Sequence, residues 1–133
     1  MTVRQFKLLI CGTRGKFAKY REMVETAIIN EMLKCQNAGL DLILIEGCCP
    51  DSADNYAEQF HKSVYGNHAL PDCVVGIQHF PSNAGNYLSR NIEMVKECDA
   101  VIAFWNGFSY GTAHTIAQAR LHNKRVDIWS LSK

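Results

Sequence analysis

Five short apolar runs, separated by segments long enough for helices, constrain the fold of this chain more than any other feature. Apolar strands that alternate with helices pair in parallel and are covered by helices on both faces. We therefore expect an α/β fold, a three-layer sandwich around a mainly parallel five-stranded sheet. At 133 residues the chain has room for one such domain, spanning 1–133. The expected strands are Leu8–Cys11, Leu42–Ile45, Val74–Phe80, Ala100–Phe104 and Val126–Trp129.

The segments between these runs carry helix and turn signals. The first has apolar residues at the spacing of one helix face and then a glycine that can end a helix: Tyr20, Val24, Ala27, Ile28 and Gly39. The second helix follows Asp51 or Ser52, either of which can cap it. Residues 65–71 and 81–85 are expected to be loops, the latter before a helix over 87–97. The face of the last helix that is expected to pack on the sheet consists of Ala113, Ile116, Ala117 and Leu121.

The charge balance excludes several kinds of partner. Lysine and arginine number 14 against 13 aspartate and glutamate, a formal net charge of +1. This creates no broad field for a nucleic acid or an anionic membrane, and we expect neither as a partner. No apolar run approaches the roughly 20 residues of a membrane-spanning helix, and no secretion signal is evident, which favours a cytoplasmic location.

The six cysteines lie mostly in or beside apolar segments, where free thiols pack as small hydrophobic groups. They lack the paired C-x-x-C spacing of zinc sites, and the adjacent Cys48 and Cys49 are poorly placed to ligate one ion together. We therefore expect no disulfide framework, no metal ion and no cofactor.

Three turns follow expected strands, at 11–15, 46–50 and 105–112. The carboxyl ends of parallel strands meet at one edge of a sheet, where ligands bind, so these turns are expected to form one rim. The third turn is the most informative because it joins glycines and hydroxyls to a helix start, whose unpaired N–H groups suit a phosphate. Its candidate ligand-binding residues are Gly107, Ser109, Gly111 and Thr112.

Other turn residues are candidates with a structural alternative. Gly12 permits unusual backbone geometry, while Thr13 and Arg14 offer a hydroxyl and a guanidinium to phosphate oxygens. A tight turn with a solvent-exposed arginine is the simpler interpretation of the same residues. Trp105 could stack on a base, although packing is the commoner role of an aromatic residue at a strand end.

Polar residues from other segments complete the expected rim. Arg90 and Asn91 lie early in a helix, from which both could point toward the ligand. Asp54 could hold sugar hydroxyls or simply interact favourably with a helix dipole. Glu46 ends an otherwise apolar strand, where an unpaired buried carboxylate is costly, so it is the candidate acid or base if there is catalysis.

Four segments match known motifs in order: C-G-T-R at 11–14, G-C-C-P-D-S-A-D at 47–54, R-N-x-x-M at 90–94 and W-N-G-F-S-Y-G-T at 105–112. They resemble the motifs of small SLOG-superfamily proteins of the YspA/YpsA-related kind, which are Rossmann-like domains. Ser52 departs from the pattern, which usually has glycine there. The resemblance implies a nucleotide or nucleotide-derived ligand bound at Gly12, Arg14, Gly47, Asp54, Arg90, Asn91, Ser109, Gly111 and Thr112.

The wider superfamily that these motifs resemble includes enzymes. Lysine-decarboxylase-like phosphoribohydrolases carry P-G-G-x-G-T-x-x-E, and nucleoside deoxyribosyltransferases carry G-T-A-x-E. In this chain Thr115 stands where both have the glutamate, and a threonine cannot serve as a carboxylate nucleophile. A similar reaction here would need Glu46 or Asp54 instead.

Three functions stay open on the sequence. The first is binding or sensing of a nucleotide-derived small molecule at the rim. The second is an N-glycosidic hydrolase or transferase acting on nucleoside phosphates, with Glu46 as acid or base and Arg90 on the phosphate. The third is a structural protein with a vestigial pocket, in which Ile29 and Met32 contact a second copy in a homodimer or higher homo-oligomer.

Overall fold

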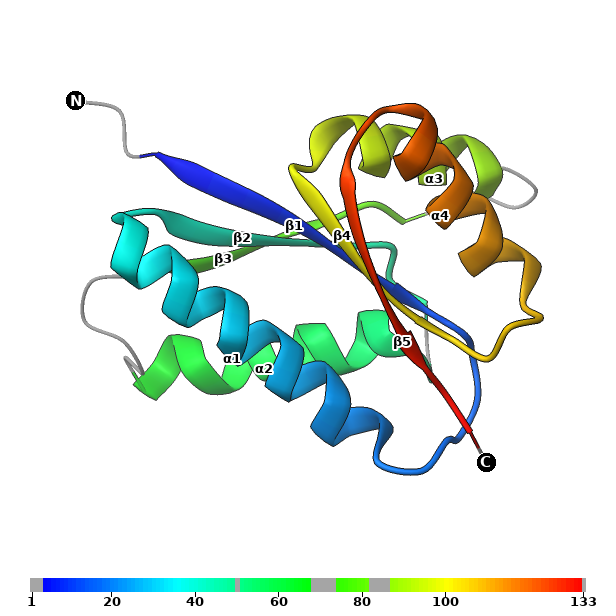
Figure 1. Ribbon diagram of the computed structural model, residues 1–133. Helices are drawn as coiled ribbons and strands as arrows, with labels where there is room; N and C mark the ends of the chain where they lie inside the picture. The colour runs from blue at the N-terminus through cyan, green and yellow to red at the C-terminus, as the bar shows by residue number, and fades with distance from the viewer. Residues whose placement is uncertain (1–3, 50, 68–73, 82–86, 133) are drawn as a thin grey trace.

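The computed structural model describes residues 4–49, 51–67, 74–81 and 87–132, and these contain a five-stranded sheet (Figure 1). All its strand pairs are parallel, and the strand order is β3-β2-β1-β4-β5. The expected α/β fold with a parallel five-stranded sheet is confirmed. Each strand overlaps an expected run: β1 (Gln5–Gly12), β2 (Asp41–Glu46), β3 (Val75–His79), β4 (Ala100–Trp105) and β5 (Arg125–Ser130).

Four helices cover the sheet, α1 and α2 on one face and α3 and α4 on the other (Figure 1). From β1 the chain moves through β2 to the edge strand β3, and then crosses to β4 on the far side of β1. This reversal creates a crevice at the carboxyl ends of β1 and β4, where ligands bind in such folds. The helices are α1 (Tyr20–Ala38), α2 (Ala53–Asn67), α3 (Tyr87–Glu97) and α4 (Tyr110–Leu121).

The core lies on both sides of the central strands. In β1, Leu8 and Ile10 pack with the α1 and α2 layer, whereas Leu9 and Cys11 pack with the α3 and α4 layer. Strands that are covered on both faces have continuous apolar sequences rather than alternating apolar and polar residues. This burial explains why the strands are recognisable in the sequence.

The first two helices largely follow the expectation. Tyr20, Val24, Ala27 and Ile28 are buried along one face of α1, and Gly39 ends the helix with a φ of 71°. Before α2, the Ser52 hydroxyl accepts a hydrogen bond from the Asp54 N–H at 3.2 Å, so Ser52 is the capping residue.

The expected loops are only partly tested. Helix α2 continues through Asn67, so the loop expected at 65–71 is wrong for 65–67. Residues 68–71 and 82–85 lie outside the described part of the chain. Helix α3 covers the expected range 87–97.

Two expectations about helix faces are wrong. Met32, expected to be available to a second subunit, is 3% exposed and packs in the core beneath α1, although Ile29 is exposed.

On α4, Ala117 is exposed and Leu121 is 74% exposed, although both were expected to pack on the sheet. The helix instead buries two threonines, which the apolar pattern counts as polar. The Thr115 hydroxyl can be buried because it bonds to the Gly111 carbonyl at 3.2 Å. The buried face consists of Thr112, Thr115, Ile116 and Ala119.

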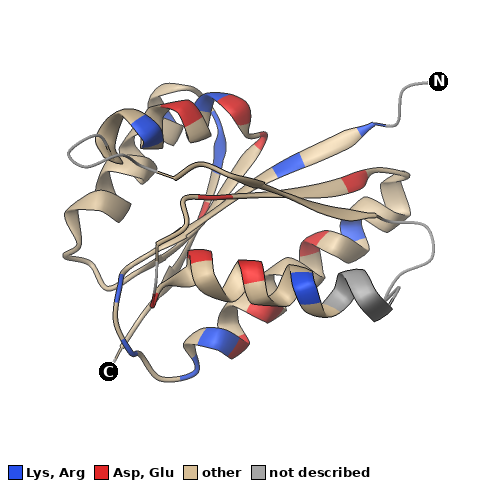
Figure 2. Ribbon diagram, turned by 180° about the vertical axis from the view of Figure 1, so that it is seen from behind, with Lys and Arg blue, Asp and Glu red and all other residues tan. Residues whose placement is uncertain are grey.

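Within the described ranges, no helix has the length and apolar character needed to cross a membrane. Figure 2 shows acidic and basic residues interspersed along the helices of both layers. This mixture of signs agrees with the small net charge of the chain.

The hydroxyl of Tyr20 joins three segments below the crevice. It donates a hydrogen bond to the Thr13 carbonyl (2.9 Å) and accepts one from the Ala53 N–H (3.0 Å). Its ring packs edge-on against Tyr56 and obliquely against Phe104. Thr13 and Ala53 are both buried, so the hydroxyl satisfies backbone groups that water cannot reach.

We expect Tyr20→Phe to lower the free energy of unfolding by about 1–3 kcal/mol, because a buried N–H and a buried carbonyl lose their partner. Urea denaturation measures this loss. The control is Tyr110→Phe, since Tyr110 is 66% exposed and its hydroxyl can bond to water. Equal stability of the two variants would contradict the structural role of the Tyr20 hydroxyl.

Candidate functional site

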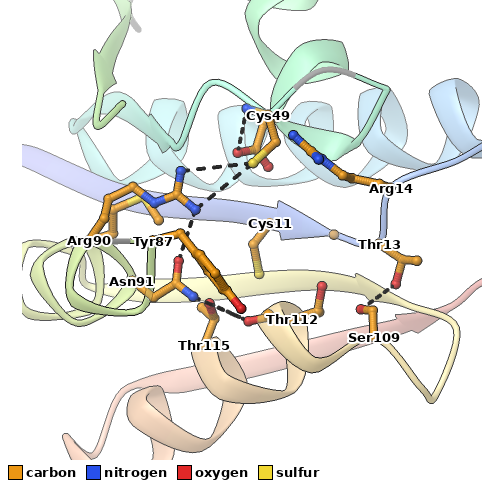
Figure 3. A pocket seen from close by; sticks show the side chains of 14 residues that line it. Cys11, Thr13, Arg14, Cys49, Tyr87, Arg90, Asn91, Ser109, Thr112 and Thr115 are labelled. Atoms are coloured by element: carbon orange, nitrogen blue, oxygen red, sulfur yellow. Dashed lines mark hydrogen bonds between the residues drawn. The ribbon is translucent and has the colours of Figure 1, made fainter. Parts of the chain in front are cut away.

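A cavity of about 400 Å³ opens at the carboxyl ends of β1 and β4, where the chain reverses (Figure 3). It brings together most of the residues that the sequence nominates, from four separate segments. Those that line it are Gly12, Thr13, Arg14, Asp54, Arg90, Asn91, Ser109, Gly111 and Thr112. The three turns and the start of α3 thus do meet at one rim.

The N-terminus of α4 forms one wall of the cavity. Ser109 occupies the capping position but makes no capping hydrogen bond with its side chain; its hydroxyl lies 3.0 Å from that of Thr13. Gly111 and Thr112 line the cavity from the first turn, which contains no acidic residue. The first N–H groups of a helix lack partners within the helix and carry a partial positive charge. This wall therefore favours an anion.

Arg90 reaches the cavity from the first turn of α3 (Figure 3). Its Nη1 donates to the Gly47 carbonyl at 2.7 Å and its Nη2 to the Asn91 side-chain oxygen at 3.3 Å. Its Nε is buried and has no hydrogen-bond partner among the described residues. In the same part of the chain, neither Arg90 nor Arg14 forms an ion pair. Two positive charges thus face the cavity without a paired carboxylate.

Asp54 is the carboxylate of the cavity. It is 4% exposed, and its Oδ2 accepts hydrogen bonds from the N–H groups of Gly47 (2.8 Å) and Cys49 (3.4 Å). Burial, followed by the charge of Glu46, raises the pKa of Asp54 to about 6, although the backbone hydrogen bonds and Arg90 act in the opposite direction. Asp54 can therefore exchange a proton near neutral pH.

Three nominated residues support the cavity without lining it. A Cβ atom at Gly47 would lie 2.5 Å from Nη1 of Arg90, so the absence of a side chain there makes room for the guanidinium. The Trp105 indole N–H donates to the Ser109 carbonyl at 3.0 Å and holds the turn, which agrees with the packing alternative. Gly107 has a φ of 89°, a conformation that favours glycine.

Glu46 also lies outside the cavity. Its fully buried carboxylate accepts a hydrogen bond from the Cys48 N–H (2.6 Å) and contacts the Cys48 thiol and Nδ1 of His79. Partial loss of hydration beside Glu46, and then the hydrogen bond to Glu46, raise the pKa of Cys48 to about 12, although the residue is exposed. The thiol is therefore protonated at neutral pH and is a poor nucleophile.

Sequence reasoning missed several residues of the region. Cavity-lining Cys11 and Met94 look like core residues in the sequence, and Cys49 like an ordinary loop thiol. Tyr87 could have been nominated from its place at a helix start, three residues before Arg90. Thr115, noted only as a replacement for glutamate, follows Thr112 on the same helix face and lines the cavity. Nothing in the sequence pattern points to the contact between Cys48 and His79, which are 31 positions apart.

Comparison with family models, with curated proteins and with solved structures found no match to the chain.

The raised pKa of Asp54 predicts a pH-dependent loss of stability. The unfolded chain releases this proton near pH 3.8 and the folded protein near pH 6, so the folded state binds more protons between these values. The free energy of unfolding contributed by Asp54 therefore falls as the pH rises through this window, by about 2–3 kcal/mol in total.

Urea denaturation of the native protein and of Asp54→Asn at pH 4, 5, 6 and 7 tests this prediction. The native protein should lose stability relative to the variant as the pH rises, because asparagine does not titrate. A difference in stability that is independent of pH would contradict the raised pKa.

Proposed function

We propose that this protein binds or senses a nucleotide or a nucleotide-derived small molecule in the cavity at the carboxyl ends of β1 and β4. One observation carries the proposal: two arginines without ion pairs, Arg14 and Arg90, share a cavity with the uncapped N-terminus of α4. Arg90 is half-buried, and a half-buried positive group without a carboxylate partner is costly unless an anion compensates it. A phosphate supplies such an anion.

The phosphate is assigned to the space between Arg90 and the first turn of α4. There the helix offers backbone N–H groups, and Thr112 and Ser109 offer hydroxyls. Arg90 brings its guanidinium charge to this space, and a phosphate oxygen can accept charge-assisted hydrogen bonds from a guanidinium. Arg14, which is exposed at the rim, suits a second phosphate group or a charged substituent.

The cavity also contains groups that can bind the sugar and the base of a nucleotide. Asp54 can accept hydrogen bonds from sugar hydroxyls. Tyr87 extends across the cavity toward α4 in Figure 3 and offers an aromatic face to a base. The volume, about 400 Å³, is within the range of small-molecule sites.

Membership of the SLOG superfamily is part of this proposal. The four motif-like segments at 11–14, 47–54, 90–94 and 105–112 each contribute a residue that lines the cavity. Segments with a shared ligand would be expected to meet in this way, which supports the resemblance.

A second candidate function is an N-glycosidic hydrolase or transferase acting on nucleoside phosphates. The observation in its favour is Asp54, a carboxyl group that lines the cavity and has a pKa of about 6. Such a group can donate or accept a proton at neutral pH. Because Glu46 lies outside the cavity, Asp54 takes the acid or base role in this version of the proposal.

A third candidate is the structural protein with a vestigial pocket. In this candidate, the exposed residues Ile29 and Leu33 of α1 would contact a second copy of the chain. Met32 is buried and would not. Light scattering that reports a homodimer, together with no effect of cavity variants, would favour it.

Arg90→Gln should weaken the binding of a nucleoside monophosphate about 10- to 100-fold, because a charge-assisted hydrogen bond to phosphate contributes about 1.5–3 kcal/mol. Isothermal titration calorimetry measures the change. Binding of the corresponding nucleoside, which lacks the phosphate, should be weak in both proteins and should change little.

Arg120→Gln is the matched control for Arg90→Gln, because Arg120 lies in the last turn of α4, away from the cavity, and its loss changes the net charge equally. Its affinity should equal that of the native protein. A screen of nucleoside monophosphates, ADP-ribose-type compounds and cyclic nucleotides in which none binds the folded protein would refute the proposed function.

The enzymatic candidate predicts that the native protein releases free base from a nucleoside monophosphate, and that Asp54→Asn slows this release at least about 100-fold. Chromatographic detection of the free base measures the reaction, and nucleotide affinity is measured in parallel. Base release at the native rate by the variant would exclude Asp54 as the acid or base.

A further inference from the structure

Three side chains with metal-binding atoms converge beside the cavity, outside the proposed nucleotide site. Glu46 is the last residue of β2 and His79 the last of β3, and the two are register partners in the parallel pair. Cys48 follows two residues after Glu46. The ligand atoms of the three side chains all lie within 4.8 Å of one another. The end of a strand pair and a short turn therefore bring one thiol, one imidazole and one carboxylate together.

The separations of these atoms suit a tetrahedral ion. The Cys48 Sγ lies 3.3 Å from Oε1 of Glu46 and 3.6 Å from Nδ1 of His79. Around a tetrahedral zinc ion with Zn–S of about 2.3 Å and Zn–N or Zn–O of about 2.0–2.1 Å, two ligand atoms are roughly 3.3–3.6 Å apart. The third pair, Nδ1 of His79 and Oε1 of Glu46, is in direct contact, and an ion would replace this contact.

The geometry does not fit a Cys-His-Glu catalytic triad. A triad places the nucleophile and the orienting carboxylate on opposite nitrogens of the imidazole. Here the same nitrogen, Nδ1 of His79, faces both the thiol of Cys48 and the carboxylate of Glu46. Three ligand atoms aimed at one point are typical of a metal site.

The turn that contains Cys48 has a strained backbone, and this conformation helps to bring the three ligand atoms together. Cys48 has a φ of 61°, in the left-handed region that a non-glycine residue rarely adopts. Its N–H donates to Oε2 of Glu46 at 2.6 Å, which holds the turn and leaves Oε1 to face the thiol. Backbone strain of this kind persists at sites where a side chain must be aimed.

The electrostatic surroundings favour a cation. Glu46 is fully buried, and among the described residues its ion-pair partner is His79, with no lysine or arginine within ion-pair distance. The charges of Asp54 and Glu58 also act on Cys48. A divalent cation would neutralise the buried charge of Glu46, with which no lysine or arginine of the described residues pairs.

We propose that Glu46, Cys48 and His79 bind a divalent cation of the zinc class. A thiolate with an imidazole suits a borderline-soft ion better than magnesium or calcium, which prefer oxygen ligands alone. Cys48 releases its proton when the ion binds. Cys48 and His79 are exposed, so the fourth coordination position faces solvent and is open to water, as in three-ligand zinc sites.

The test titrates the full chain, freed of metal with a chelator, with Co²⁺ as a spectroscopic probe and with Zn²⁺ in calorimetry. A thiolate-to-cobalt charge-transfer band with tetrahedral d–d bands, and one Zn²⁺ bound per chain, are expected. Cys48→Ser should abolish the charge-transfer band. Both Cys48→Ser and His79→Gln should lower Zn²⁺ affinity at least about tenfold.

The matched control is Cys49→Ser, because this adjacent thiol lines the nucleotide cavity and is not part of the cluster. It should bind Zn²⁺ like the native protein. Circular dichroism checks that each variant is folded, and Cys48 and His79 are exposed enough for substitution. The absence of Zn²⁺ binding by the native protein, or equal loss in the Cys48 and Cys49 variants, would overturn the proposal. Neither outcome bears on nucleotide binding, which Arg90→Gln tests separately.

Discussion

The parallel pairing of β1 with β4 is the constraint on which the rest of the structure depends. Because of this pairing, β1 lies between β2, which precedes the reversal of strand order, and β4, which follows it. Both edges of β1 are therefore paired, and both of its faces are covered by helices. The pairing also fixes where the turn after β1 meets the turn after β4, since Thr13 N–H donates to the Phe104 carbonyl at 2.8 Å. The cavity depends on this pairing, because the turn after β1 and the start of α4 after β4 form part of its wall. Asp54 of α2 and Arg90 of α3 complete the wall.

The cavity balances opposite charges through the backbone rather than through ion pairs. Asp54 is held by two N–H groups and Arg90 by a carbonyl and an amide oxygen. A direct ion pair between the two would satisfy both and leave little for a ligand. Separate hydrogen-bonded supports instead leave a carboxyl group and a guanidinium lining the same cavity.

Much of the fold could be predicted from the sequence because strands such as β1 and β4 are apolar throughout, and burial on both faces requires this. The turns at 11–15 and 105–112 were predictable because glycines and hydroxyls mark them. Other features depend on three-dimensional packing. The predicted face of α4 was wrong because the buried Thr115 hydroxyl bonds to its own helix. The prediction for Met32 was wrong because Met32 follows Ile28 by four residues and continues the buried face of α1. The direction of Glu46 depends on the neighbouring strand, which a linear pattern does not contain.

Gly47 connects the two buried or half-buried charged side chains of the cavity. Its N–H bonds to Asp54 and its carbonyl to Arg90, and its missing side chain leaves room for the guanidinium. A methyl group here would lie 2.5 Å from Nη1 of Arg90 and 3.1 Å from Oδ2 of Asp54, so the charged side chains would have to move. The spacing of the guanidinium and the carboxyl group around the cavity therefore depends on the absence of a side chain at this one position.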